Sequence, residues 1–228
     1  MRKADMVTLI GGSLTGLALI TGLIDEICLA VKLLLLAYLM DVVDGWVARK
    51  YDEPDERGQM LDRVLDRVSQ VVVPLTLFIA TYEKYLGGYS LGIMYIYASI
   101  MIPAIFYRLV YRARRSLDYF PGTPLFVHAL ILLGAVIYGS YHSFYSFILL
   151  VAALGTALDI PYFRRRTGSG PSPAVAGRAI VILLLVAIPC ASTIWQGIGI
   201  VLLSVGVLYA AVGWIIYLVL SYSENNTR

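Results

Sequence analysis

The chain has 228 residues, of which 59% are hydrophobic and 14% charged, with a mean hydropathy of +0.78 and a formal net charge of +3. A soluble domain is about 45–50% apolar and about 25% charged, so this composition excludes an ordinary soluble protein, a disordered chain, a coiled coil and a disulfide-rich secreted module. The small net charge gives no reason to expect a nucleic-acid partner. Continuous rather than alternating apolar runs favour membrane-spanning helices over a spanning β-barrel.

Eight apolar runs follow one another along the chain. A helix crosses the hydrocarbon core of a bilayer with roughly 20 residues, so we predict an all-α, polytopic integral-membrane helical bundle of about eight transmembrane helices. The runs are 7–24, 27–48, 59–81, 88–111, 124–139, 142–162, 176–194 and 197–221. A seven-helix alternative fuses residues 124–162 into one helix.

A Gly-, Ser- and Pro-rich stretch, Thr167–Pro173, separates the first six predicted helices from the last two. This composition is typical of a linker. We therefore expect a six-helix core over residues 1–166, a linker over 167–175 and two additional transmembrane helices over 176–228.

The basic residues of the loops indicate an orientation. If eight helices alternate in direction, one set of loops contains basic residues from Arg2 and Lys3 to Arg164–Arg166 and Arg228, whereas the opposite set contains Lys84. Cytoplasmic loops carry an excess of Lys and Arg. We therefore expect both termini on the cytoplasmic side.

Three residues inside apolar runs are interpreted as structural. Cys28 and Cys190 lie far apart in the sequence, and we interpret both as small buried hydrophobic side chains. We interpret His128, a lone histidine on an apolar run, as a packed or hydrogen-bonded side chain rather than a catalytic base.

Carboxylates gather at the junction of the second and third predicted helices. Asp41 and Asp44 are three residues apart at the end of the second helix, and Asp62 and Asp66 are four residues apart on the third. Each pair therefore shares a helix face. Two consecutive antiparallel helices joined by a short loop bring the four carboxylates together near the cytoplasmic boundary.

Four neighbouring carboxylates repel one another, and a divalent cation relieves that repulsion. Oxygen-only ligands suit Mg²⁺, Mn²⁺ or Ca²⁺, and four carboxylates can hold two ions, an arrangement used for displacement at phosphorus. Gly45, Ala48 and Gly58 leave room for a phosphate-bearing ligand, and Arg49 offers a phosphate-matching guanidinium. The alternative, a solvated helix-end network in which the acids pair with arginines, does not explain the interleaved small residues.

The pattern Asp41-x-x-Asp44-Gly45-x-x-Ala48-Arg49, followed after eight residues by Gly58-x-x-x-Asp62-x-x-x-Asp66, resembles the signature of the CDP-alcohol phosphotransferase family. The resemblance implies an enzyme that transfers a phosphatidyl- or archaetidyl-type group from a CDP-lipid to an alcohol and releases CMP. It also implies the family's six-helix core, to which the last two helices are an addition, and a homodimer.

The family's site residues carry over to the matching positions. The resemblance implies two divalent ions, Mg²⁺ or Mn²⁺, held by four aspartates, the last of which also acts as the general base. It further implies a set of residues that contact the CDP group. The metal ligands are Asp41, Asp44, Asp62 and Asp66, the base is Asp66, and the CDP contacts are Asp41, Gly45, Ala48, Arg49, Gly58 and Asp62.

The acceptor is suggested by further motifs. The run Asp66-x-x-Ser69-x-x-Val72-x-Pro74 resembles membrane-type phosphatidylserine synthases but has Gln70 and Val71 where they have Phe-Gly. Arg108-Leu109 and Phe120-x-Gly122-x-Pro124 resemble two later motifs of that subfamily, and Ala4–Leu9 is similar to the start of archaeal members. We therefore favour L-serine as the acceptor.

A serine carboxylate needs a cationic partner, and Arg108 and Arg112 are the candidate acceptor-binding residues. Either arginine could instead bind the phosphate of glycerol phosphate or inositol phosphate, which are the alternative acceptors, or extend to lipid headgroups. A cation transporter is the alternative of a different class, but the acids lie near one membrane face and no second broken helix mirrors them.

Overall fold

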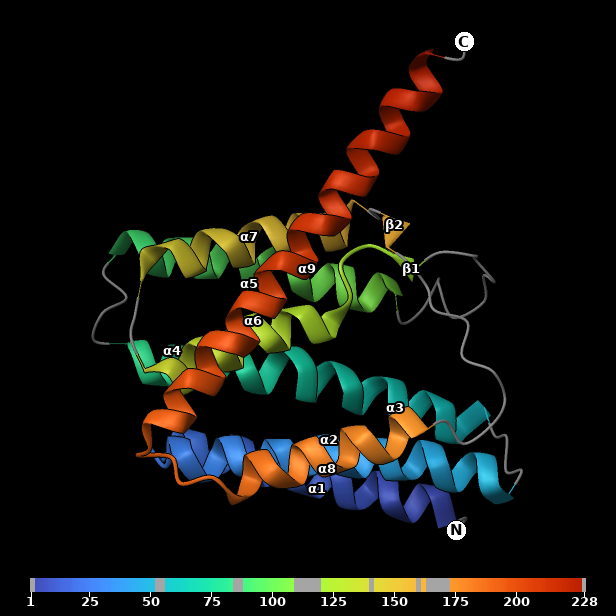
Figure 1. Cartoon of the computed structure of the whole chain (residues 1–228), viewed down its shortest axis with the longest axis vertical. Helices are drawn as coiled ribbons and strands as arrows, with labels where there is room; N and C mark the ends of the chain where they lie inside the picture. Colours follow the sequence, from blue (N-terminus) through green and yellow to red (C-terminus); the bar gives the residue numbers. More distant parts are fainter. Residues whose placement is uncertain are drawn as a thin grey trace. The chain divides into compact units, whose positions relative to one another are not determined.

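The computed structural model describes residues 3–51, 56–83, 88–108, 120–139, 142–158, 161–162 and 173–226. Within these ranges a helix occurs at each of the eight apolar runs, which confirms the all-α prediction (Figure 1). A π-helical turn, η1 (Val68–Val72), joins α3 and α4 into one continuous helix. The α-helices are α1 (Lys3–Leu23), α2 (Ile27–Tyr51), α3 (Glu56–Arg67), α4 (Val73–Tyr82), α5 (Gly88–Tyr107), α6 (Leu125–Tyr138), α7 (Ser143–Ala157), α8 (Pro173–Ala187) and α9 (Thr193–Asn226).

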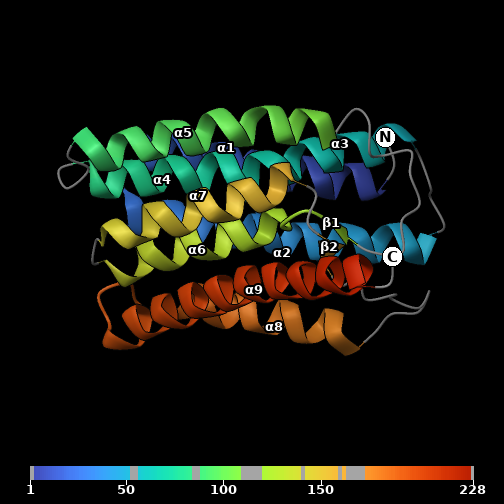
Figure 2. The same ribbon diagram turned by 90° about the horizontal axis from the view of Figure 1, so that it is seen from above.

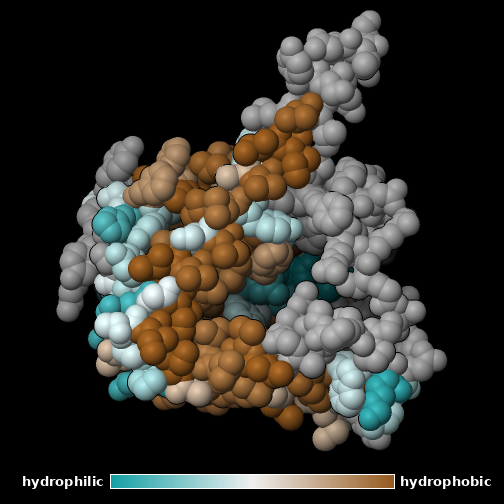
Figure 3. All heavy atoms as spheres, in the orientation of Figure 1, coloured by the Kyte–Doolittle hydropathy of each residue, from teal (hydrophilic) through white to brown (hydrophobic). Residues whose placement is uncertain are grey.

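Four of the described segments are long and apolar enough to cross a bilayer: Ala4–Leu23, Met60–Tyr82, Ser90–Tyr107 and Thr193–Ile216. Large apolar side chains also stay exposed on these helices, as the band of brown side chains along α9 in Figure 3 shows. Exposed apolar surface of this extent marks contact with a membrane or a partner rather than with water. The chain is an integral membrane protein.

The seven-helix alternative is wrong. α6 ends at Tyr138, and Gly139 adopts a left-handed conformation (φ 76°) with its N–H donating to the Ala135 carbonyl. This is a standard helix C-terminal cap, in which glycine is favoured because it has no Cβ. A separate helix, α7, begins at Ser143.

Two compact units make up the chain, and the first comprises residues 1–81 and 167–196. In it α1 packs along α2, the turn Ile24–Glu26 joins them, and α8 packs on α2. α1 also contacts α3, where a Cβ added to Gly12 would lie 3.0 Å from Leu65 Cδ1. Close packing of α1, α2 and α3 fixes the helix ends that carry the aspartates.

Cys28 and Cys190 form a disulfide, with their Cα atoms 6.1 Å apart, so the interpretation of both as separate buried hydrophobic side chains is wrong. The packing of α8 on α2 brings the end of α8 to the start of α2. A separation of 162 residues concealed this pairing in the sequence.

The second unit comprises residues 82–166 and 197–228. Here α7 packs on α5 and α6, and the two-residue strands β1 (Phe120–Pro121) and β2 (Pro161–Tyr162) pair antiparallel. α9 runs beside α6 with direct backbone contact (Figure 2). A Cβ on Gly134 would lie 2.5 Å from the Leu203 nitrogen, and one on Gly199 would lie 2.4 Å from the Tyr138 nitrogen. Glycine at both positions therefore permits this helix crossing.

Each unit thus contains one of the two C-terminal helices, α8 or most of α9. The expected division into residues 1–166, 167–175 and 176–228 stays a prediction.

Candidate metal centre

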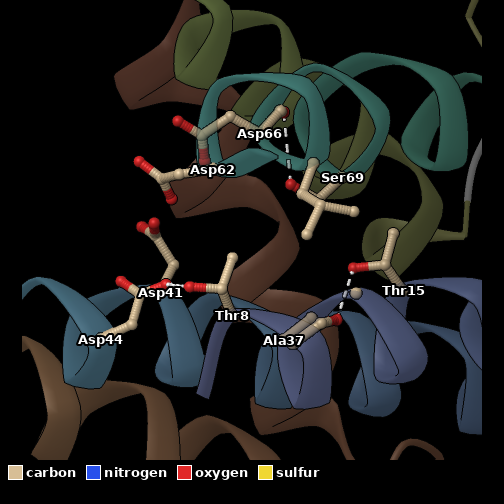
Figure 4. A pocket seen from close by; sticks show the side chains of 11 residues that line it. Thr8, Thr15, Ala37, Asp41, Asp44, Asp62, Asp66 and Ser69 are labelled. Atoms are coloured by element: carbon tan, nitrogen blue, oxygen red, sulfur yellow. Dashed lines mark hydrogen bonds between the residues drawn. The ribbon is translucent and has the colours of Figure 1, made fainter. Parts of the chain in front are cut away.

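Four aspartates from two helices of the first unit line one pocket. Asp41 and Asp44 come from the last turns of α2, and Asp62 and Asp66 from successive turns of α3. Figure 4 shows Asp62 and Asp66 pointing from α3 toward Asp41. The pocket encloses about 20 Å³, which is enough space for one water-sized body.

Three of the carboxylates are close enough to share an ion. Asp41, Asp62 and Asp66 each offer one oxygen, and these oxygens all lie within 4.8 Å of one another. With Mg–O bonds of about 2.1 Å, opposite ligands of one Mg²⁺ are about 4.2 Å apart. Neighbouring ligands of an octahedral ion are only about 3 Å apart, so the three carboxylates would bind one ion after closing by up to about 2 Å, with other ligands at the remaining positions. An all-oxygen donor set of this kind fits Mg²⁺ or Mn²⁺.

Asp44 is more buried than its neighbours. Its residue surface is 6% exposed, whereas Asp41 is exposed and Asp62 and Asp66 are half-buried. The Thr8 hydroxyl, on α1, donates a hydrogen bond of 2.8 Å to Asp44 Oδ2. A buried carboxylate without a cation is unfavourable unless such donors contact it.

Asp66 lies two residues before the π-helical turn. Gln70 Nε2 donates to Asp66 Oδ1 at 3.3 Å, and the Ser69 hydroxyl donates to the Asp66 carbonyl at 3.2 Å. The Tyr38 hydroxyl, on α2, donates to the Ser69 carbonyl at 2.8 Å. A single π-helical turn within an α-helix is rare and frequent at functional sites.

The predicted CDP contacts lie on the same two helices. Gly45 and Ala48 are half-buried on α2, and Gly58 is half-buried near the start of α3, where an added Cβ would lie 3.0 Å from Asp5 Oδ1. Among the described residues, these three do not line the aspartate pocket itself. The side chain of Arg49 lies outside the part of the chain that the structure describes.

Arg108, a candidate acceptor-binding residue, belongs to the second unit and is 8% exposed. Its Nη1 donates to the Thr123 carbonyl at 3.1 Å and its Nη2 to the Thr156 carbonyl at 3.0 Å. The side chain also lines a hollow of about 450 Å³ between the ends of α5 and α7. Arg112, the other candidate, lies outside the described residues.

His128 is fully buried and hydrogen-bonded through both ring nitrogens. Nε2 lies 2.9 Å from the Thr156 hydroxyl and Nδ1 lies 3.2 Å from the Tyr97 hydroxyl. The prediction of a hydrogen-bonded, structural histidine is confirmed.

Sequence reasoning missed Thr8, Tyr38 and Gln70 as neighbours of the aspartates. Gln70 stood out only as a departure from the phosphatidylserine synthase pattern. Its position four residues after Asp66 already placed it on the face of that carboxylate. Thr8 and Tyr38 carried no signal, because their contacts depend on how α1 and α2 pack.

Comparison with known proteins gives two findings. The model of the CDP-alcohol phosphatidyltransferase family matches residues 1–158. An uncharacterized protein of Aquifex aeolicus (strain VF5) is 36% identical over 81 residues, which are 36% of this chain and 41% of that relative. This match therefore spans less than half the length of the relative. The family match includes the aspartate pocket and ends at the C-terminus of α7, before α8 and α9.

Proposed function

The chain belongs to the CDP-alcohol phosphatidyltransferase family, and on this premise we propose that it is a membrane phospholipid synthase. The proposed reaction transfers a phosphatidyl- or archaetidyl-type group from a CDP-lipid to an alcohol and releases CMP. The observation that carries this proposal is the convergence of Asp41, Asp44, Asp62 and Asp66 on one pocket.

The metal ligands in this proposal are the four aspartates, and the ions are two Mg²⁺ or Mn²⁺. Bound divalent ions would neutralise charge on the diphosphate and on the departing CMP. The three carboxylate oxygens within 4.8 Å of one another support at least one such ion.

The proposed transfer forms one bond at phosphorus, breaks another and moves one proton. The acceptor hydroxyl oxygen forms a bond to the β-phosphorus while the bond between that phosphorus and the oxygen of CMP breaks. Asp66 accepts the hydroxyl proton as general base, a role that the family signature gives to its last aspartate. Gly45, Ala48, Arg49 and Gly58 lie against the CDP group.

The acceptor that we favour is L-serine. Arg108 and Arg112 would bind its carboxylate, and a guanidinium can do so through two parallel hydrogen bonds. Arg108 lines a hollow of about 450 Å³, and because its Nη1 and Nη2 each already donate to a carbonyl, it would bind the acceptor through its remaining N–H groups. Glycerol phosphate or inositol phosphate, whose phosphate suits the same arginines, is the second candidate acceptor.

A cytoplasmic active site is supported by two independent features. The basic loops lie at the aspartate end of the predicted helices. Cys28 and Asp44 are 16 residues apart on α2, so the disulfide is about 24 Å from the aspartates along the helix axis. Disulfides persist in oxidising compartments, which supports a cytoplasmic location for the opposite, aspartate end of α2. A homodimer completes the proposal.

The test uses the purified chain in mixed micelles with a CDP-lipid donor and Mg²⁺ or Mn²⁺. CMP release is measured with L-serine, glycerol 3-phosphate or myo-inositol 1-phosphate added separately. We expect serine-dependent release that EDTA abolishes and that Asp66→Asn removes. Release only with another acceptor would keep the family reaction and reject serine. Folded protein that releases no CMP with any acceptor would reject the reaction and return the cation transporter to consideration.

A further inference from the structure

We propose that Thr8 and Gln70 are positioning residues, which hold Asp44 and Asp66 in the orientation that binds the divalent cation. This inference rests on the proposed metal site. It goes beyond that site because neither residue belongs to the aspartate signature and neither needs to contact the ion.

Thr8 makes its contact across two helices. Its hydroxyl lies 2.8 Å from Asp44 Oδ2 on α2 and 3.1 Å from the Ala4 carbonyl on its own helix. A hydroxyl has one proton, and an ionised carboxylate is the stronger acceptor. The hydrogen bond to Asp44 is therefore the favoured one, and it joins α1 to the carboxylate that is most buried.

Gln70 acts from within the helix that carries Asp66. Its amide donates to Asp66 Oδ1, which restricts rotation of the carboxylate. The π-helical turn Val68–Val72 contains Gln70, and the Tyr38 hydroxyl on α2 contacts that turn at the Ser69 carbonyl. α2 thereby fixes the segment from which Gln70 reaches Asp66.

Both donors suit a metal site better than a purely structural network. Thr8 and Gln70 are neutral, so they orient a carboxylate without neutralising the negative charge that attracts a cation. Groups that hydrogen-bond to metal-binding carboxylates in this way typically change metal affinity or activity by 10–100-fold when they are removed. The structure also provides a contrast in Thr15, which lines the same pocket but donates to the Gly11 carbonyl of its own helix.

The experiment measures Mn²⁺ binding to the purified full chain by electron paramagnetic resonance, without donor or acceptor. The variants are Thr8→Val, which removes the hydroxyl at nearly constant size, Thr8→Ser, which retains it, and Gln70→Leu. Thr15→Val is the matched control for Thr8→Val. Thermal unfolding of each variant reports whether it folds.

We expect Thr8→Val and Gln70→Leu each to raise the Mn²⁺ dissociation constant by roughly tenfold or more. Thr8→Ser and Thr15→Val should bind Mn²⁺ with the affinity of the unchanged chain. A general effect of packing at Thr8 would instead weaken Mn²⁺ binding in Thr8→Ser as well. Unchanged Mn²⁺ affinity in folded Thr8→Val and folded Gln70→Leu would overturn the inference. If Thr8→Val does not fold, the inference is tested by the Mn²⁺ affinity of the folded Gln70→Leu variant and by that of Thr8→Ser.

The same titration separates this inference from the proposed function. Failure of the unchanged chain to bind Mn²⁺ would reject the metal site itself, and with it both proposals. Binding to the unchanged chain with no weakening in the two variants would reject only the positioning roles.

Discussion

Gly122 is the position where one added methyl group should displace the candidate acceptor-binding arginine. Gly122 has a φ of +73°, which L-residues rarely adopt. A Cβ there would lie 1.7 Å from Arg108 Nη2 and 2.7 Å from the Thr156 carbonyl oxygen. Gly122→Ala therefore requires Arg108 Nη2 to move, which breaks its hydrogen bond to the Thr156 carbonyl.

The magnitude has two parts. The left-handed conformation alone disfavours alanine by about 1–2 kcal/mol. Loss of the Arg108–Thr156 hydrogen bond adds about 1.5–3 kcal/mol, because the donor is charged. The sum, roughly 2.5–5 kcal/mol, corresponds to a decrease in Tm of about 5–20 °C for a chain of this size.

Gly139→Ala is the matched control, since Gly139 has a φ of +76° and no described group lies within 4 Å of an added Cβ. It should show only the backbone contribution of about 1–2 kcal/mol. Thermal unfolding in detergent compares the two variants. If Arg108 binds the acceptor as proposed, Gly122→Ala also raises KM for the acceptor and Gly139→Ala does not. Equal destabilisation with an unchanged KM in both variants would refute this reasoning.

Three further predictions concern the helix crossing, the disulfide and the metal. Gly199→Ala should markedly destabilise the chain because its Cβ would lie 2.4 Å from the Tyr138 nitrogen. Gly197→Ala should not, because no described atom lies within 4 Å of its added Cβ, and thermal unfolding distinguishes the two variants. Cys28→Ser, which removes the disulfide to Cys190, should lower the unfolding temperature but retain CMP release, and loss of CMP release from the folded variant would contradict this. EDTA should abolish CMP release and excess Mg²⁺ restore it, and EDTA-resistant turnover would exclude the metal requirement.

Helix positions followed from the sequence because apolar run length is a strong local signal in a membrane protein. The clustering of the aspartates also followed, since spacings of three and four residues place Asp41 with Asp44 and Asp62 with Asp66 on single helix faces. Both inferences need only local geometry and the antiparallel relation of two consecutive helices.

Contacts between distant segments could not be inferred in this way. The Cys28–Cys190 disulfide depends on α8 packing against α2, and the Thr8–Asp44 hydrogen bond depends on how α1 rotates against α2. Two motifs that looked separate, Arg108-Leu109 and Phe120-x-Gly122-x-Pro124, meet where Gly122 leaves room for the Arg108 guanidinium. Only the tertiary structure shows that these residues form one feature.

The most direct test of the metal-dependent aspartate site is anomalous X-ray diffraction from crystals of the full chain soaked in Mn²⁺. We expect an anomalous peak in the aspartate pocket, within about 2.5 Å of carboxylate oxygens of Asp41, Asp62 and Asp66, and its loss in crystals of Asp62→Asn. A second peak beside it that involves Asp44 would support the two-ion arrangement. No peak among these aspartates at a Mn²⁺ concentration that supports full CMP release would contradict the proposed site.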